Sequence, residues 1–305
     1  MRIMIAGPTA SGKTSLSIKL AKKMDGEIIS VDSRQCFRYL NIGTSKPTDE
    51  ELNEVPHHNI SNLDPDTEDS VALFSEREKL YRSDIEKRGK QILYCGGSTL
   101  HLQSIIRPLD PIPSSDPDNI KKLNRIAGQK GLKHLFQELQ KVDPDYAQKM
   151  DGFNRQRIIR ALDVWTQTGK PFSSYHRDTP IDKPKDLIVF VLHWPRNELH
   201  KRISDRTDKM LREGFLDEVK HLLEMGYSPE IQALKTVGYR EAIQHLTGKI
   251  DYDKMVKDIK TATRRYAKRQ ITWFRRWPFV ERLDLTEKSE ETLLNELLQK
   301  VAANG

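Results

Sequence analysis

The sequence predicts an α/β fold: a P-loop-containing parallel sheet flanked by helices, with an inserted helical domain. Short apolar runs at residues 2–7, 27–31, 90–97 and 187–194 have the length and composition of buried strands. Helical patterns at 14–24 and 71–89 separate the first three runs, and this alternation is typical of a parallel sheet. A glycine-rich motif that follows the first strand supplies the phosphate loop.

The inserted domain is predicted from two changes in composition. Residues 107–118, RPLDPIPSSDPD, are rich in Pro and Asp, and the segment 173–186 is again polar and contains two Pro. The chain between them is mainly helical in pattern, and the apolar run at 187–194 then returns to the sheet. We therefore expect a helical domain at 111–184, inserted into a catalytic core formed by 1–110 and 185–305.

Composition limits the possible classes of protein. The 305 residues are 36% hydrophobic and 31% charged, which suits a globular chain with a sizeable core. No run approaches the roughly 18 apolar residues of a membrane span, so no membrane partner is expected. Cys36 and Cys95 are too few for a disulfide framework, which favours a reducing cytoplasm.

Positive charge is concentrated near the C-terminus. The net charge is +7, which permits a polyanionic partner without naming one. Residues 259–280 contain seven Lys or Arg and no Asp or Glu. This stretch is the strongest compositional indication of such a partner.

The motif GPTASGKT matches the phosphate-loop pattern G-x-x-x-x-G-K-[ST] between a predicted strand and a predicted helix. Its backbone amides and the helix N-terminus can hold phosphate oxygens. Lys13 can neutralise a terminal phosphate, and the Thr14 hydroxyl can reach Mg²⁺, the expected cofactor. The binding residues are therefore predicted to be Gly7, Pro8, Thr9, Ala10, Ser11, Gly12, Lys13 and Thr14.

The kind of phosphate compound is less constrained than the loop itself. Nucleotide hydrolases normally pair this loop with a second strand that ends in an Asp for magnesium. Here the third strand ends in Gly96 and Gly97, and only Asp32 follows a strand. A motor ATPase is therefore disfavoured, and kinases and other transferases that hold a diphosphate remain open, as does physiological nucleotide binding.

Asp32 has three possible roles. It could hold magnesium, take a proton from a substrate, or cap a helix, because Asp-Ser-Arg-Gln reads as a capping box with Gln35 three residues on. Its sequence context alone leaves these roles open.

An ordered set of motifs resembles the tRNA dimethylallyltransferase family, also called tRNA isopentenyltransferases, in its bacterial form. The motifs are GPTASGKT, DSRQCFRYLNIGTSKP, PHHNI, LYCGGSTLH, NRQRIIRALDVWTQTGKPFS, LKTVGYREAI and ATRRYAKRQITWFRR, and they extend from residue 2 to about 277. The resemblance implies transfer of a dimethylallyl group from dimethylallyl diphosphate to the exocyclic N6 amine of the adenine 3′-adjacent to the anticodon. It also implies that the phosphate loop and Mg²⁺ bind the diphosphate.

The resemblance assigns roles to particular residues. Asp32 matches the family's general base, Arg206 an arginine that grips the diphosphate, and Ser98 a hydroxyl that touches the substrate. From the residues alone, we would favour a surface arginine paired with Asp205 or Asp208. The tRNA anticodon stem-loop is expected to contact Asp32, Ser33, Arg34, Gln35, Ser98, Gln156, Arg157, Ile158, Ile159, Arg160, Arg264 and Lys268.

The basic stretch is predicted to form a helix with two faces. Ile259, Ala262, Tyr266, Trp273 and Trp277 fall on one face, which we expect to be core. The opposite face is cationic, and phosphate contacts from it would give affinity and register rather than sequence specificity. Its members are Arg264, Lys268 and Arg275, with Arg265, Arg269 and Arg276 beside them.

Two departures from the family pattern stand out. Ser98-Thr99 replaces a Thr-Gly pair, so a left-handed backbone at Thr99 would cost about 1 kcal/mol. In the same segment, His101 replaces a Tyr and is expected to pack. The second departure is Asp151-Gly-Phe-Asn154, which replaces His-Pro-Asn-Asp.

Three alternatives remain beside the leading interpretation: an adenylate isopentenyltransferase, a small-molecule P-loop kinase, and a nucleic-acid-binding NTPase. A monomer is expected.

Overall fold

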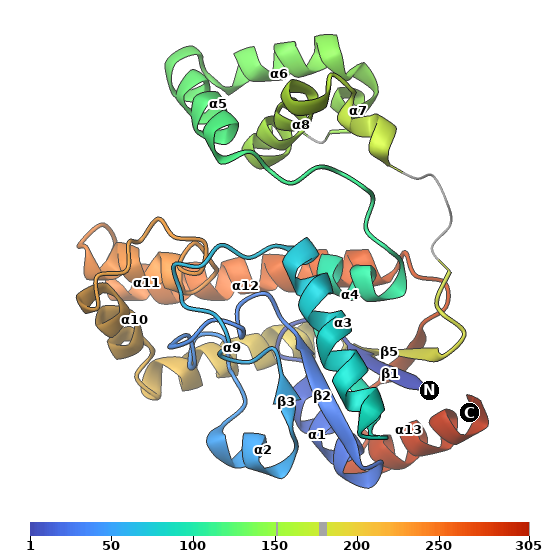
Figure 1. Cartoon of the computed structure of the whole chain (residues 1–305). Helices are drawn as coiled ribbons and strands as arrows, with labels where there is room; N and C mark the ends of the chain where they lie inside the picture. The colour runs from blue at the N-terminus through green and yellow to red at the C-terminus, as the bar shows by residue number, and fades with distance from the viewer. Residues whose placement is uncertain (151, 177–181, 305) are drawn as a thin grey trace. The chain divides into compact units, whose positions relative to one another are not determined.

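The structure, a computed structural model, describes residues 1–150, 152–176 and 182–304 (Figure 1). The chain divides into two compact units, one made of Met1–Arg107 and Ile181–Gly305 and the other of Pro108–Pro180. The sequence placed these boundaries at 110/111 and 184/185, within four residues of the observed division. Asp151, in the altered turn, lies outside the described residues.

The larger unit contains one six-stranded sheet in which every neighbouring pair of strands is parallel. The α/β fold class and the four predicted strands are confirmed. Two further strands were missed, because one has two residues and the other is a polar edge strand. In the order β3-β2-β4-β1-β5-β6, the strands are His57–His58, Gly26–Val31, Gln91–Gly96, Arg2–Ala6, Leu187–His193 and Glu281–Asp284.

The register of the sheet brings three strand ends together. Ala6 of β1 and Val31 of β2 both lie opposite Gly96 of β4, and Ala6 also lies opposite Val191 of β5. The chain therefore leaves β1, β2 and β4 at one edge of the sheet, the carboxyl edge where open parallel sheets bind ligands.

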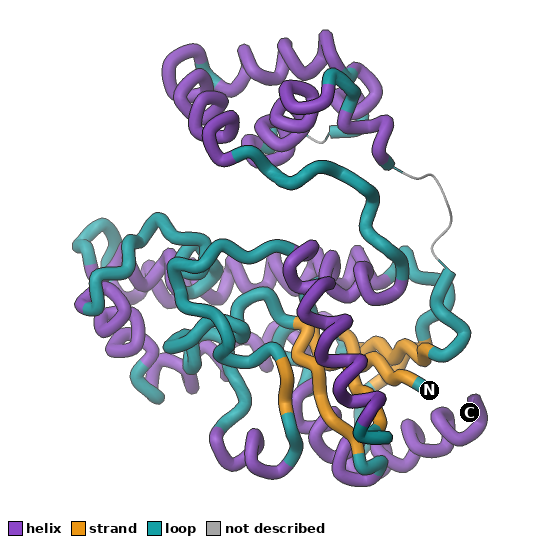
Figure 2. The backbone as a smooth tube through the Cα atoms, in the orientation of Figure 1, coloured by secondary structure: helices purple, strands orange, loops and turns teal. Residues whose placement is uncertain are grey.

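Helices cover both faces of the sheet (Figures 1 and 2). On one face the strand side chains pack against α1 and α13, through residues such as Leu20 and Leu297. On the other face they pack against α3, α4 and the end of α12, through Phe74, Leu102 and Phe274. These helices are α1 (Lys13–Lys23), α13 (Glu290–Asn304), α3 (Val71–Lys87), α4 (Thr99–Ile106) and α12 (Tyr252–Phe274).

A second core of this unit forms among the C-terminal helices and the segment after β2. Phe37 and Leu40 pack with Phe215, Tyr239 and residues of α12. Helix α9 lies beside α12, and α10 and α11 come between them in the sequence (Figure 1). The bounds are α2 (Asp49–Glu54), α9 (Arg196–Arg212), α10 (Phe215–Glu224) and α11 (Tyr239–Leu246).

The smaller unit is helical, as predicted, and has its own core around Leu139, Ile158 and Val164. Its elements are α5 (Pro117–Lys130), α6 (Leu132–Val142), α7 (Pro144–Gln148), α8 (Arg155–Thr168) and a 3₁₀ turn, η1 (Phe172–Tyr175). None of the helices in the described part of the chain is both long and apolar enough to cross a membrane.

Candidate active site

The phosphate loop curls between β1 and α1 as its motif predicts. Ala10 and Gly12 both have positive φ, 63° and 90°, and these two residues turn the backbone into α1. At Gly7 a Cβ atom would lie 3.0 Å from Ser11 Oγ and 3.2 Å from Leu192 Cβ, so this position favours glycine for close packing. The result is a compact loop at the N-terminus of a helix, a geometry that binds anions.

The phosphate-loop lysine is held inside its own loop. Lys13 Nζ donates to the carbonyl oxygen of Pro8 at 2.7 Å and lies 3.5 Å from Ser11 Oγ. Burial lowers the pKa of Lys13 to about 8; the Arg206 charge acts in the same direction, and Asp32 opposes it. The charges of Arg206 and Asp32 therefore both act on this ammonium, whose hydrogen-bond partner is a carbonyl oxygen of its own loop.

Three side chains that the motif did not indicate fix the loop from outside. Trp194 Nε1 donates to Ser11 O at 3.1 Å, and Arg202 Nε donates to Ala10 O at 2.8 Å. Gln270 of α12 accepts from the Thr9 amide at 2.9 Å and donates to Gly97 O at 2.8 Å. Gln270 is only 3% exposed, so it is a buried polar bridge between the phosphate loop and the turn after β4.

Asp32 caps a turn with one of its two carboxylate oxygens. Oδ1 accepts from the amides of Arg34, at 2.8 Å, and Gln35, at 3.3 Å. Residues 33–36 form a turn and not a helix, and Gln35 does not reach back, so the predicted capping box is only half present. Oδ2 has no hydrogen-bond partner among the described residues, which leaves it available to a substrate.

A cavity of about 370 Å³ brings together several of the predicted residues. This volume lies in the range of small-molecule sites. Asp32, Ser33 and Arg34 line it from the segment after β2, Thr9 from the phosphate loop, and Arg206 from α9. Residues 32 and 206 lie far apart in sequence and meet here because α9 crosses the carboxyl edge of the sheet.

Arg206 is directed at the phosphate loop. Nη1 donates to Thr9 Oγ1 at 2.7 Å, and Nη2 donates to the carbonyl of Thr44 at 3.3 Å. Burial lowers the pKa of this guanidinium, and the charge of Asp32 partly offsets the effect. In the described ranges Arg206 forms no ion pair with Asp205 or with Asp208, which pairs with Lys260, so the alternative of such a surface pair is wrong.

The wall of the cavity beside Thr44 is anchored by Glu218 of α10. Its carboxylate accepts from the amides of Asn41 (2.8 Å), Ile42 (2.7 Å) and Gly43 (3.2 Å), and from Tyr239 Oη at 2.6 Å. Four donors on one carboxylate fix the segment whose Thr44 carbonyl holds Arg206. No sequence motif indicated Glu218.

The prediction that Tyr266 is a core residue is wrong. It lines the cavity with Asp32, because α12 passes over the carboxyl edge and presents a side to it. Burial raises the pKa of Tyr266 to about 12, the Asp32 charge contributes, and a hydrogen bond with Ser98 acts the other way. The buried residues of the helix are Met255, Ile259, Ala267, Gln270 and Phe274. The expected core positions of Ile259 and Trp277 are confirmed, since both are 2% exposed.

The loop before α11 is a further part of the cavity that sequence reasoning missed. Residues 235–240 line it, including Lys235 and Arg240, and Arg269 lines it from α12. The LKTVGYREAI motif contributed to the family resemblance, but the spacing of its residues did not indicate a particular chemical role.

The turn after β4 supports the cavity from behind. Ser98 is 6% exposed, and its Oγ accepts from the amide of Ser33 at 3.0 Å. Thr99 begins α4 and has no positive φ, so the anticipated backbone cost does not arise. His101 packs edge-on against Phe74 with ring centroids 4.9 Å apart, and burial lowers its pKa to about 4.

Gln35 is directed away from the Asp32 cavity. It accepts from Ser30 Oγ at 3.0 Å and donates to the carbonyls of Thr44 and Ser45. It lines a small separate cavity that also includes Thr14 and Cys95. Arg34 does line the Asp32 cavity, and its buried Nε has no hydrogen-bond partner among the described residues.

The predicted residues of α8 divide into two groups. Gln156 and Arg157 are exposed, whereas Ile158 and Ile159 are 0% and 5% exposed and belong to the core of the smaller unit. Arg160 pairs with Asp163 at 2.7 Å. On α12, Lys268 is exposed, and Arg264 donates to Ser204 Oγ at 2.9 Å.

Most ligands of a metal at this site would have to come from the substrate. No group of three or more His, Cys, Asp or Glu side chains suited to a metal occurs within the described ranges. The Thr14 hydroxyl has no hydrogen-bond partner among them. A hydroxyl together with phosphate oxygens and water is a ligand set that suits Mg²⁺.

Comparison with known proteins gives the family. The profile of the family described as IPP transferase matches residues 35–277, and that described as isopentenyl transferase matches residues 1–64. The chain belongs to the tRNA dimethylallyltransferase family. It is 43% identical over 305 residues to the tRNA dimethylallyltransferase of Carboxydothermus hydrogenoformans, covering 99% of this chain and 98% of the relative.

Solved structures of this family share the fold. The full-length tRNA isopentenylpyrophosphate transferase from Bacillus halodurans is 34% identical, with a TM-score of 0.73 and coverage of 99% of this chain and 95% of that one. A eukaryotic dimethylallyltransferase, whose structures are described as snapshots of the enzyme acting on tRNA, gives a TM-score of 0.83 at 29% identity. The alignment covers 99% of this chain and 78% of that protein.

Proposed function

We propose that this tRNA dimethylallyltransferase transfers a dimethylallyl group from dimethylallyl diphosphate to the N6 amine of the adenine 3′-adjacent to the anticodon. The observation that carries the proposal is the shared cavity of Asp32, Arg206 and the phosphate-loop residue Thr9. It offers a carboxylate for an amine and a cation for a diphosphate side by side. Relatives named for tRNA over nearly the whole chain favour RNA over a free nucleotide, and favour transfer over kinase or NTPase activity.

The donor end of the site is the phosphate loop. The loop amides, the N-terminus of α1, Lys13 and Arg206 are the groups that would hold the diphosphate. As the carbon–oxygen bond breaks, its electron pair goes to a diphosphate oxygen, and these positive groups offset the growing charge. When bound through Thr14, Mg²⁺ would supply further charge neutralisation for the leaving group.

The acceptor end is Asp32. The lone pair of adenine N6 is delocalised into the ring, so the amine becomes a useful nucleophile only as it loses a proton. We assign Asp32 Oδ2 as the general base that accepts this proton while the new carbon–nitrogen bond forms. The products are N6-dimethylallyl adenine, pyrophosphate and a proton, which Asp32 then releases to solvent.

The adenine must leave its stack to reach this carboxylate. Ser33, Arg34 and Tyr266 line the cavity it would enter, and Ser98 supports Ser33 and Tyr266. The anticodon stem-loop would contact Lys268 and Arg264 of α12 and the exposed Gln156 and Arg157 of the smaller unit. Gln35, Ile158, Ile159 and Arg160 would act by holding backbone and core in place. We also propose that the enzyme is a monomer and that it acts in the cytoplasm.

The first experiment is incubation with dimethylallyl diphosphate and unmodified tRNA, followed by mass analysis of the nucleosides. A dimethylallyl increment on adenosine at the position 3′ of the anticodon is expected. Absence of this increment at saturating substrate, from enzyme that binds tRNA, rejects the proposed reaction.

The variant Asp32→Asn tests the base. Asparagine keeps Oδ1 and can still accept from the amides of Arg34 and Gln35, so the turn is preserved while the base is removed. Turnover should fall by about 10²–10⁴, the usual contribution of general base catalysis, with tRNA affinity nearly unchanged. Asp66→Asn, at an exposed loop residue, is the matched control. Turnover within about threefold of wild type would mean that Asp32 serves only the turn.

A further inference from the structure

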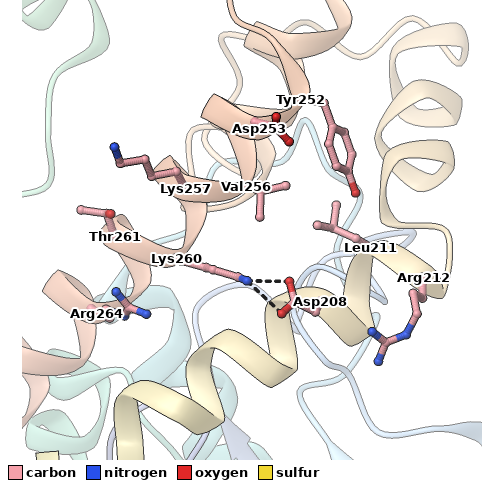
Figure 3. A pocket seen from close by; sticks show the side chains of 10 residues that line it. All are labelled: Asp208, Leu211, Arg212, Tyr252, Asp253, Val256, Lys257, Lys260, Thr261 and Arg264. Atoms are coloured by element: carbon pink, nitrogen blue, oxygen red, sulfur yellow. Dashed lines mark hydrogen bonds and ion pairs between the residues drawn. The ribbon is translucent and has the colours of Figure 1, made fainter. Parts of the chain in front are cut away.

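A second hollow lies outside the Asp32 cavity, in the larger unit, between the C-terminal end of α9 and the N-terminal half of α12 (Figure 3). Its volume is about 680 Å³, larger than that of the Asp32 cavity. None of the proposed reaction chemistry uses it.

The groove carries uncompensated positive charge. Lys260 Nζ contacts both carboxylate oxygens of Asp208, at 2.6 and 2.8 Å, and these two charges neutralise each other (Figure 3). Arg212, Lys257 and Arg264 also line the groove, and none of them forms an ion pair with any described residue. Asp253 is the one other acid in the lining, so positive charge exceeds negative.

Arg264 has a hydrogen-bond donor that a ligand could use. Its Nη2 donates to Ser204 Oγ at 2.9 Å, which fixes the guanidinium at the edge of the groove. Its Nε is buried and has no hydrogen-bond partner in the described ranges. A buried donor without a partner is costly, and an anion in the groove would satisfy it.

The floor of the groove is apolar and includes an exposed aromatic ring. Leu211 and Val256 lie below Tyr252, whose side chain extends from the first turn of α12 toward Leu211 (Figure 3). Tyr252 is 46% exposed, and His245 of α11 packs edge-on against it with ring centroids 5.9 Å apart. The ring is therefore supported from one side and accessible from another.

An accessible aromatic ring beside unpaired cations is the combination that binds single-stranded nucleic acid. We propose that this groove binds an unpaired nucleotide of the RNA substrate other than the modified adenine. The base stacks on Tyr252, and the adjoining phosphates pair with Arg212, Lys257 and Arg264. The inference rests on the proposed function, because it takes RNA as the substrate.

The cationic face of α12 gives this RNA a continuous path. Lys257, Arg264, Lys268 and Arg275 follow one another at intervals of seven, four and seven residues, which keeps them on one face of the helix. From Lys257 to Arg275 this face extends about 27 Å at the rise of an α-helix. Lys254 pairs with Asp258 at 3.0 Å, so Asp258 does not neutralise Lys257. The groove is thus one end of a longer phosphate-binding surface.

The test is equilibrium binding of unmodified tRNA over a series of salt concentrations. The double variant Arg212→Ala/Lys257→Ala should weaken binding and reduce the slope of log K against log salt by about 1 for each lost phosphate contact. Tyr252→Ala should weaken binding by roughly tenfold at every salt concentration and leave the slope unchanged. Lys23→Ala/Lys79→Ala removes two exposed charges on α1 and α3 and should change neither quantity.

Several outcomes would overturn the inference. An unchanged slope in the double variant together with wild-type affinity in Tyr252→Ala would exclude RNA from the groove. If these variants lost ATP or AMP binding and kept wild-type tRNA binding, the groove would be a site for a free nucleotide, and the inference would also be wrong. Arg212, Lys257 and Tyr252 are all exposed, so thermal unfolding should stay close to wild type. Failure of the proposed function is distinguishable, because wild-type enzyme would then not prenylate tRNA at all.

Discussion

Replacing Gln270 tests whether helix α12, which carries the proposed RNA contacts, positions the phosphate loop. Gln270→Leu keeps the approximate size of the side chain and removes both of its hydrogen bonds. The amide of Thr9 and the carbonyl of Gly97 then lose their partners at 2.9 and 2.8 Å in a buried location. An unsatisfied buried group costs about 1–3 kcal/mol. If about half of the combined cost of about 2–6 kcal/mol falls on the diphosphate-bound state, kcat/KM should decrease by roughly 5–150-fold.

The assay is steady-state kinetics in which each substrate is varied at saturation of the other. The KM for dimethylallyl diphosphate should rise while the KM for tRNA stays nearly constant, because the broken contact is on the phosphate loop. Gln270→Glu keeps the acceptor for the Thr9 amide but places a carboxylate near the diphosphate, so its defect should also be in diphosphate KM. Gln299→Leu, on the exposed side of α13, is the matched control. Equal changes in both KM values, or a lower melting temperature with unchanged kinetics, would refute the reasoning.

Three further predictions concern the phosphate loop and the walls of the Asp32 cavity. Because burial lowers the pKa of Lys13 to about 8, the free enzyme loses this charge above pH 8, and diphosphate binding there must take up a proton. Calorimetry from pH 7 to 9 should therefore show pyrophosphate affinity falling more steeply in wild type than in Lys13→Arg. Parallel plots of affinity against pH would exclude Lys13 as the group that takes up the proton. Glu218→Gln should raise the diphosphate KM and lower the melting temperature by a few degrees, because an amide NH₂ must face donors that now bind a carboxylate; a melting change alone would limit Glu218 to stability. Gly43→Ala should destabilise the fold by about 1–3 kcal/mol in chemical denaturation, since its Cβ would lie 2.4–2.6 Å from the Phe215 and Tyr239 rings; Gly128→Ala, with no neighbour within 4 Å, should not.

The parts of the site that could be predicted from sequence are those whose chemistry is contiguous. The phosphate loop is eight consecutive residues between a strand and a helix, so its position and backbone geometry follow from the motif. The four long strands follow from apolar runs that both faces of the sheet bury. By contrast, β3 has two residues and β6 is Glu-Arg-Leu-Asp, and neither gives an apolar run.

Contacts between segments that are far apart in the sequence could not be predicted in the same way. Glu218 acts on amides about 175 residues earlier, and nothing in its helix pattern distinguishes it from a solvated Glu. Tyr266 was assigned to the core because aromatic residues on one helical face usually pack. Which part of such a face meets a cavity depends on where the helix crosses the sheet, and that is a property of the topology.

Gln270 is the residue for which the sequence did contain a usable signal. It lies three residues after Ala267 and four before Phe274, so it falls on the buried face of an amphipathic helix. A polar side chain in that position must find hydrogen-bond partners inside the protein. The partners are the two loops that leave the carboxyl edge of the sheet, and the exposed cations lie on the other side of the same helix. A single rigid element therefore carries the proposed RNA contacts, one side of the Asp32 cavity and the support of the phosphate loop. We therefore propose that the acid-free stretch at 259–280 connects the two substrate sites and is more than a basic surface.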